Sequence, residues 1–173
     1  MTAKTVLLVI VAVMILLAVG FAAMRNKQKQ RNAASQSGTF SVLQGNVDAH
    51  PMFAMIDMGL RDSPERQSLP IFLSISTPLI NPTSDGLPTK NDEDSLNSWE
   101  DAVEARLQSA GRFVFVGRVT WNGHRELLYY LATQQPASDN LKTLADARST
   151  RPFAFASERD EKWTKASFWL NRK

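Results

Sequence analysis

The first feature of the hydrophobic pattern is one long apolar run near the amino terminus. Thr5–Met24 contains no charged side chain and is rich in Val, Leu, Ile, Met and Ala. A helix rises about 1.5 Å per residue, so this run reaches roughly 30 Å, the thickness of a bilayer's hydrocarbon core. We therefore expect one transmembrane helix, with the lipid bilayer as a partner. A cleaved signal peptide is the alternative, because Lys4 precedes the run and small residues lie near its end.

Shorter apolar stretches further along the chain predict strands. Five stretches alternate apolar and polar positions or form brief apolar runs: Met52–Leu60, Leu69–Thr77, Phe113–Trp121, His124–Thr133 and one around Phe153 and Phe155. The third and fourth flank Asn122-Gly123, the dipeptide that best adopts the two positive φ angles of a type I′ turn. These two strands are therefore predicted to form a hairpin.

Helical periodicity separates these strands. Three segments carry apolar residues at steps of three and four or begin at a capping residue: Ser95–Ala110, Ala137–Arg148 and a terminal helix that Asp160 caps and that carries Trp163 and Leu170. Helices placed between strand pairs favour an α+β fold. We expect an antiparallel or mixed sheet of about five strands with helices packed on it, in the ferredoxin-like class.

The distribution of charge separates the amino-terminal segment from the rest of the chain. The sequence has 173 residues and a net charge of +3, yet residues 1–31 hold five of its 20 Lys and Arg and none of its 17 Asp and Glu. The rest of the chain is therefore slightly acidic, which excludes a nucleic-acid partner. We predict a membrane anchor over residues 1–24, a basic polar tether over 25–39 and one soluble α+β domain over 40–173.

The cations also predict an orientation in the membrane. Arg25, Lys27, Lys29 and Arg31 follow the apolar run, whereas only Lys4 and the terminal amine precede it. Cytoplasmic flanks carry the excess of Lys and Arg. We therefore expect a single-pass protein of the bacterial inner membrane with its domain in the cytoplasm, and a periplasmic domain is the alternative.

Catalytic motifs are missing from the sequence. The only histidines are His50 and His124, neither at metal-ligand spacing, and no nucleophile elbow or phosphate-binding glycine loop is present. The chain has no cysteine, which excludes disulfides, thiolate ligands and a cysteine nucleophile. We therefore predict no catalytic residue, metal or cofactor. The alternative is a hydrolase-like enzyme in which a carboxylate and His124 act as acid and base.

The predicted hairpin offers the best candidate binding residues. A two-residue turn sets Trp121 opposite His124 and Thr120 opposite Arg125. Strict alternation then puts Phe113 and Phe115 on the Trp121 face. The candidates for ligand or partner binding are the polar and aromatic residues of both faces: Arg118, Trp121, His124, Arg125, Glu126 and Tyr130. Arginine pairs with carboxylate or phosphate through two hydrogen bonds, so the tip is suited to a peptide or a small anion.

Several short motifs resemble one known family. They are Asp85-Gly86-Leu87-Pro88, the run from Val116 to Gly123 and the closing Asp160-Glu161-Lys162-Trp163. From about Met52 to Leu170 the chain is similar to the bacterial domain-of-unknown-function family 695. The resemblance implies an α+β domain and brings no activity or catalytic residue with it.

These patterns lead to a hypothesis about function. We expect a membrane-anchored, non-enzymatic interaction or regulatory module that uses the hairpin tip and the Pro78–Asp94 loop to contact a protein partner. The oligomeric state stays open, because an edge strand such as Met52–Leu60 or the last strand could pair between chains.

Overall fold

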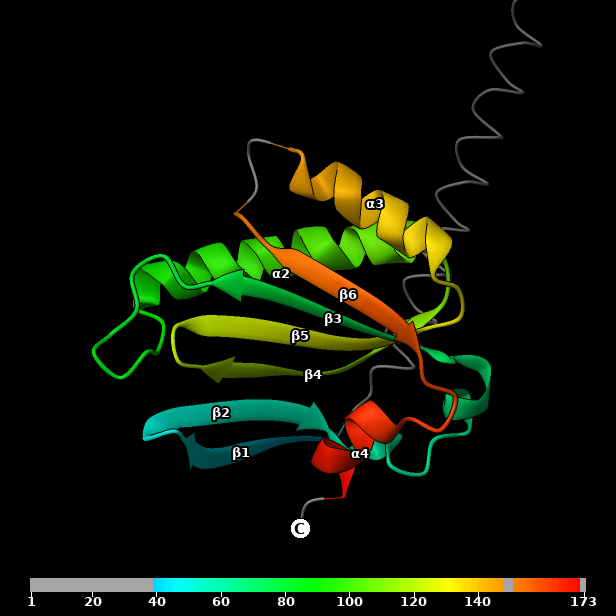
Figure 1. Cartoon of the computed structure of the whole chain (residues 1–173), viewed down its shortest axis with the longest axis horizontal. Coiled ribbons are helices and arrows are strands. Elements are labelled where there is room, and N and C mark those ends of the chain that lie inside the picture. The colour runs from blue at the N-terminus through cyan, green and yellow to red at the C-terminus, as the bar shows by residue number, and fades with distance from the viewer. Residues whose placement is uncertain (1–38, 148–150, 172–173) are drawn as a thin grey trace, which may run out of the picture. The chain divides into compact units, whose positions relative to one another are not determined.

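A computed structural model describes residues 39–147 and 151–171 of the chain. Along the chain the elements are β1 (Phe40–Val47), β2 (His50–Asp57), η1 (Met58–Leu60), η2 (Pro64–Ser68), β3 (Ile71–Pro78), α2 (Lys90–Ala110), β4 (Phe113–Trp121), β5 (His124–Leu131), α3 (Gln135–Ala145), β6 (Ala154–Arg159) and α4 (Thr164–Leu170). The strands form one sheet in the order β1-β2-β4-β5-β3-β6, and every neighbouring pair is antiparallel (Figure 1). The α+β prediction is confirmed.

The predicted membrane anchor and nearly all of the tether lie outside the described residues. Among the residues that the structure describes, no helix is long and apolar enough to cross a membrane. From β3 to β6 the elements follow the β-α-β-β-α-β order that ferredoxin-like folds share, and the β1–β2 hairpin widens the sheet beyond it.

The first strand, β1, was not among the predicted strands. β1 carries only weak alternation, and Val42 is 65% exposed. Its turn to β2 uses Asp48 and Ala49 at positive φ, without the Asn-Gly signal. The prediction that Met52–Leu60 lies at an edge is therefore wrong, because β1 pairs with β2, whereas the last strand does lie at an edge.

Local contacts account for two of the places where an element ends or begins away from its predicted position. Residues 58–60 form a 3₁₀ turn instead of continuing the strand, because the Asp57 carboxylate accepts a hydrogen bond from the Gly59 N–H at 3.0 Å. Helix α2 begins at Lys90, five residues before Ser95, with Asp92 in its first turn.

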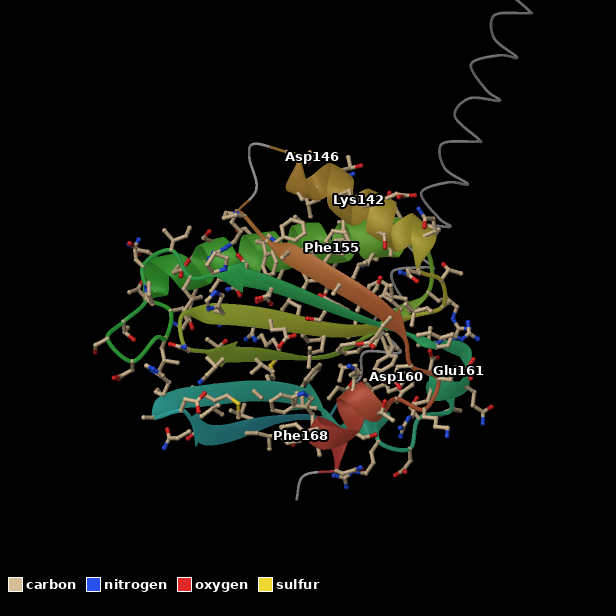
Figure 2. All side chains as sticks on the ribbon, in the orientation of Figure 1. Lys142, Asp146, Phe155, Asp160, Glu161 and Phe168 are labelled. Atoms are coloured by element: carbon tan, nitrogen blue, oxygen red, sulfur yellow. The ribbon has the colours of Figure 1, made fainter. Side chains whose placement is uncertain are left out.

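The capping role of Asp160 is confirmed. Its carboxylate accepts hydrogen bonds from the backbone N–H groups of Thr164 and Lys165, both at 2.9 Å, at the start of α4. Figure 2 shows Asp160 where the chain passes from β6 to this helix. Orphan N–H groups at a helix start are thereby satisfied.

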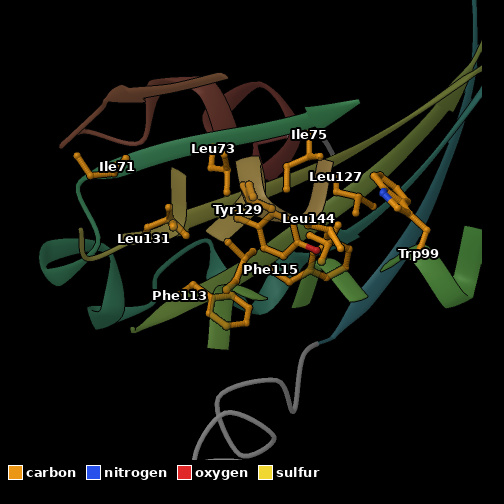
Figure 3. Packing of buried hydrophobic residues seen from close by; sticks show 14 of the residues in the cluster. Ile71, Leu73, Ile75, Trp99, Phe113, Phe115, Leu127, Tyr129, Leu131 and Leu144 are labelled. Carbon is orange, nitrogen blue, oxygen red and sulfur yellow. The ribbon is translucent and has the colours of Figure 1, made fainter. Parts of the chain in front are cut away.

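Each face of the sheet buries its own apolar cluster. Helices α2 and α3 pack on one face over residues such as Leu73, Phe115, Leu127 and Tyr129 (Figure 3). On the other face, α4 packs with residues from β2, β4 and β5. A buried side chain of this size stabilises the fold by about 1.5–3 kcal/mol, so the two clusters hold both layers to the sheet.

The β4–β5 hairpin forms as predicted at its tip and differs at its base. Trp121 pairs with His124 and Thr120 with Arg125, but the register shifts between Phe115 and Gly117. This bulge moves Phe113 and Phe115 to the α2 face, so their predicted place on the Trp121 face is wrong. Gly117 is required there, because a Cβ would lie 2.3 Å from the Met55 carbonyl oxygen.

Candidate functional site

The hairpin tip and the long loop before α2 come together in the structure. The Gly123 N–H donates to the Gly86 carbonyl at 2.9 Å, and the Leu79 N–H donates to the Gly123 carbonyl at 2.7 Å. Gly86 has φ +73°, and a Cβ there would lie 2.9 Å from the Gly123 nitrogen. The loop can approach the turn this closely only with glycine at that position. Two parts of the predicted contact surface are therefore one surface.

A pocket of about 340 Å³ opens beside this tip, on the face that carries α2. Strands, loop and helix all contribute to its lining: Val42, Phe53, Ala54, Met55, Leu87, Pro88, Glu93, Arg118, Thr120 and Arg125. Its walls are apolar on the β1, β2 and loop sides and charged on the β4, β5 and α2 sides. Pockets of this mixed character bind ligands that have an apolar body and a few polar groups.

Two arginines of the pocket share one carboxylate of α2. Arg118 Nη1 lies 3.1 Å from Glu100 Oε2, and Arg125 Nη1 lies 3.1 Å from Glu100 Oε1. The Arg125 side chain is 6% exposed, and its Nε also donates to Thr120 Oγ1 at 3.0 Å. Arg118 is 32% exposed. Within the described residues, Nε and Nη2 of Arg118 have no hydrogen-bond partner, so they remain able to bind an anion.

The pKa shifts around Glu100 follow from burial and from neighbouring charges. Burial lowers the pKa of Arg125, while the charge of Glu100 acts against this. Burial also raises the pKa of Glu104, one turn further along α2, and the acids Asp101 and Glu100 raise it more. The two arginines thus supply positive charge next to a helix that carries several acids.

Trp121, His124 and Glu126 lie on the opposite face of the sheet. With Ser76 and Val119 they line a second hollow of about 250 Å³. Trp121 Nε1 donates to the Val47 carbonyl at 3.0 Å, and His124 Nδ1 lies 3.1 Å from the Asn122 carbonyl. Glu126 accepts a short hydrogen bond from the Ser74 hydroxyl. The candidate residues at the tip therefore divide between two separate places.

Tyr130, the sixth candidate, is part of the core. Its ring stacks on Trp163 with 3.8 Å between centroids and 6° between planes. Its hydroxyl donates to Asp160 Oδ2 at 2.6 Å, and Tyr130 lines neither pocket. Burial and the neighbouring Asp160 raise the pKa of Tyr130, so it stays a neutral hydrogen-bond donor. The structure gives Tyr130 a structural position.

A second arginine–carboxylate group lies outside the predicted site residues. Arg151 Nη1 binds Asp92 Oδ1 at 3.0 Å, and the two side chains are only 4% and 2% exposed. Arg151 also donates to Ser95, to the Thr77 hydroxyl and to the Pro78 carbonyl. No local signal marks this pair, because its members lie 59 positions apart and meet only in the folded chain.

Glu100, on α2, was likewise not among the predicted site residues. Asp57, the one acid in an apolar strand, caps the 3₁₀ turn after β2, and burial raises its pKa.

Among the described residues, no group of three or more His, Cys, Asp or Glu side chains could hold a metal ion.

Comparison with known proteins gives one match. A family model described as a family of unknown function (DUF695) matches residues 40–168, which includes β1 and every later strand. No curated protein and no solved structure matches the chain.

Proposed function

The chain belongs to the family of unknown function DUF695, and from this premise we propose that its domain is a non-enzymatic interaction module. In this proposal a peptide segment of a protein partner enters the pocket beside the hairpin tip. A carboxylate of that segment binds Arg118, and apolar side chains of the segment contact Phe53 and Leu87. Glu100 holds the guanidinium of Arg118 in place, and Arg125 in turn binds Glu100.

One observation carries this proposal. Arg118 is fixed by Glu100 through one nitrogen, while its other donors have no partner among the described residues. A carboxylate can accept two parallel hydrogen bonds from such a guanidinium. The apolar lining from β2 and the loop gives the same ligand a surface on which to bury side chains.

We also propose that the domain is held at the inner face of a bacterial inner membrane. The support is the uncharged run Thr5–Met24 and the four cations that follow it. Fusing a reporter that is active only in the cytoplasm after Lys173 tests the orientation. We expect an active reporter. An inactive one, with a periplasmic reporter active in its place, would contradict the cytoplasmic assignment.

The binding role can be tested by site-directed photo-crosslinking in the full chain. A photoreactive amino acid at Leu87, which lines the pocket, is expected to cross-link a discrete partner in membranes of the host. Arg118→Gln should reduce that product about tenfold, since one charged contact is lost. Arg112→Gln is the matched control, because Arg112 also pairs with a glutamate at 3.1 Å but lies outside the pocket.

The outcome of this experiment separates the alternatives. The proposal would be contradicted if the yield of the cross-linked product did not change in Arg118→Gln, or if it fell equally in Arg112→Gln. The hydrolase-like alternative would act in the other hollow, where His124 and Glu126 lie. There the hydrogen bonds join His124 to Asn122 and Glu126 to Ser74, rather than to each other. Among the described residues no hydrogen bond or ion pair joins His124 to a carboxylate, as the acid–base pair of that alternative would require, so the interaction module is the better-supported proposal.

A further inference from the structure

The two edges of the sheet differ in how they are protected. β6, at one edge, carries Glu158 and Arg159, and the carboxylate of Glu158 binds Lys165 at 2.8 Å. β1, at the other edge, has no ionisable side chain along its eight residues. Charged residues on an edge strand discourage pairing with another chain. β6 is therefore protected by charge, and β1 is not.

β1 also exposes apolar side chains. Val42 is 65% exposed, Phe40 40% and Val47 38%. Within residues 39–147 and 151–171, no strand pairs with the outer edge of β1. Its outward N–H and C=O groups are thus available to another strand. A strand with these properties is a template for β-strand addition.

We propose that β1 pairs with β1 of a second copy of this chain, antiparallel across a two-fold axis, so that two sheets become one. A two-fold interface must be complementary to itself, because the same patch comes from both copies. β1 meets this condition, since an uncharged strand opposite itself brings no like charges together. The same pairing at β6 would bring charged side chains to the junction.

The alternation of side chains limits the register of this pairing. Phe40 contacts Phe115 and Val42 lines the pocket, so the even-numbered residues of β1 point to the α2 face. When both helical layers lie on the same side, an even-numbered residue must face an even-numbered one. The central registers therefore set Val42 opposite Val42, Val42 opposite Gln44, or Gln44 opposite Gln44.

The pairing has a consequence for the pocket. A second β1 would lie about 4.8 Å from the first, and its even-numbered side chains would stand beside Val42. Val42 is the residue that β1 contributes to the lining of the pocket. The second copy would thus supply part of that lining and bring two pockets to one face of the dimer. The pairing itself does not depend on any role of Arg118.

Disulfide trapping tests the three registers directly. The natural chain has no cysteine, so each introduced one is unique. The full chain is prepared in membranes as Val42→Cys, as Gln44→Cys and as a mixture of both, and is oxidised gently. We expect a disulfide-linked dimer in one of the three samples, because paired residues lie within disulfide reach. Ala156→Cys, exposed on β6, is the matched control and should stay monomeric.

A second measurement uses charge instead of cross-linking. The double variant Val42→Lys, Gln44→Lys should raise the dimer dissociation constant at least about tenfold in analytical ultracentrifugation of the detergent-solubilised chain. Ala156→Lys and Arg118→Gln should leave the dimer dissociation constant unchanged. Because Arg118→Gln is expected to weaken peptide binding, an unchanged constant for this variant distinguishes dimer formation from peptide binding. Circular dichroism checks that each variant folds.

Three results would overturn the proposal. One is a monomer in all three cysteine samples although the thiols react with a maleimide. Another is that no dimer forms and the thiols do not react with a maleimide. This would mean that a different segment or protein covers β1. The third is equal cross-linking of Ala156→Cys, which would show random collision.

Discussion

Two arginine–carboxylate groups tie α2 to the rest of the domain, one through Asp92 and one through Glu100. Asp92 and its partner Arg151 are almost completely buried. Every nitrogen of the Arg151 guanidinium donates a hydrogen bond to the protein. This group joins the start of α2 to the end of β3 and to the segment before β6, and four of the five guanidinium N–H donors are used within the fold.

The group around Glu100 has the same chemistry, but Arg118 keeps donors that have no partner among the described residues. We therefore call it the open group, and the Asp92–Arg151 group the closed group. The Glu100 carboxylate binds two arginines, of which Arg125 is buried and Arg118 is 32% exposed at the pocket. Satisfied donors stabilise the fold, whereas donors without a protein partner can serve a ligand. The comparison therefore teaches that the type of residue does not identify a site; the number of unsatisfied donors at an accessible surface does.

Breaking the closed group should have the largest effect. Arg151→Met leaves the Asp92 carboxylate buried without its cation, so we expect the free energy of unfolding to fall by about 3–5 kcal/mol. Urea denaturation followed by tryptophan fluorescence measures this. The double variant Asp92→Leu, Arg151→Met is the control and should recover most of the loss, since it buries no charge. A loss below about 1 kcal/mol for the single variant would refute the structural role.

Asp160 is another carboxylate that is hydrogen-bonded within the fold, and it makes the stability of the domain depend on pH. Burial alone would raise its pKa, but hydrogen bonds from Tyr130, Lys165 and Thr164 outweigh burial and lower the pKa to about 2. The folded-state pKa lies below the ordinary value of 3.8, so the stabilisation is complete above pH 3.8 and is lost as the pH falls towards 2.

Asp160→Asn should therefore cost about 2–3 kcal/mol near neutral pH and much less near pH 2. Urea denaturation of the variant and the natural chain over this pH range measures the difference. A difference that does not change with pH would mean that the charge of Asp160 contributes nothing.

Breaking the open group at its centre should cost less than either. Glu100→Gln leaves Arg118 and Arg125 without their shared anion, and we expect a loss of about 1–2 kcal/mol in urea denaturation. Glu104→Gln is the matched control on the same helix. Burial and neighbouring acids raise the pKa of Glu104, so ionising it opposes folding, and its replacement should leave stability unchanged or slightly higher. Equal losses in both variants would argue against a specific role for Glu100.

The sequence predicted what local patterns determine. Asn122-Gly123 located the hairpin and its register at the tip, and the spacing of Leu96, Trp99 and Val103 located the buried side of α2. The division of the tip into an Arg118–Arg125 face and a Trp121–His124–Glu126 face followed from alternation alone and is confirmed. Such features need only near neighbours in the chain.

The rest depended on contacts between distant positions. The register shift between Phe115 and Gly117 lies where Gly117 approaches Met55 on another strand, a contact that no spacing in β4 reveals. Asp92 and Arg151 carry no signal until the fold brings them together. β1 was missed because it is mostly exposed, alternates only weakly and is joined to β2 by an unusual turn. Long-range pairing thus determined which polar residues are buried and which remain available at the pocket.

The smallest effect on stability is expected where we expect the largest effect on binding. Arg118→Gln removes a partly exposed ion pair, so the free energy of unfolding should change by less than about 1 kcal/mol. The cross-link from Leu87 should nevertheless fall about tenfold, because the substitution also removes the donors that the fold does not use. Measuring both quantities on the same preparation decides the comparison. If Arg118→Gln destabilised the domain as strongly as Arg151→Met, both groups would be structural, and the proposed binding role of the pocket would be contradicted.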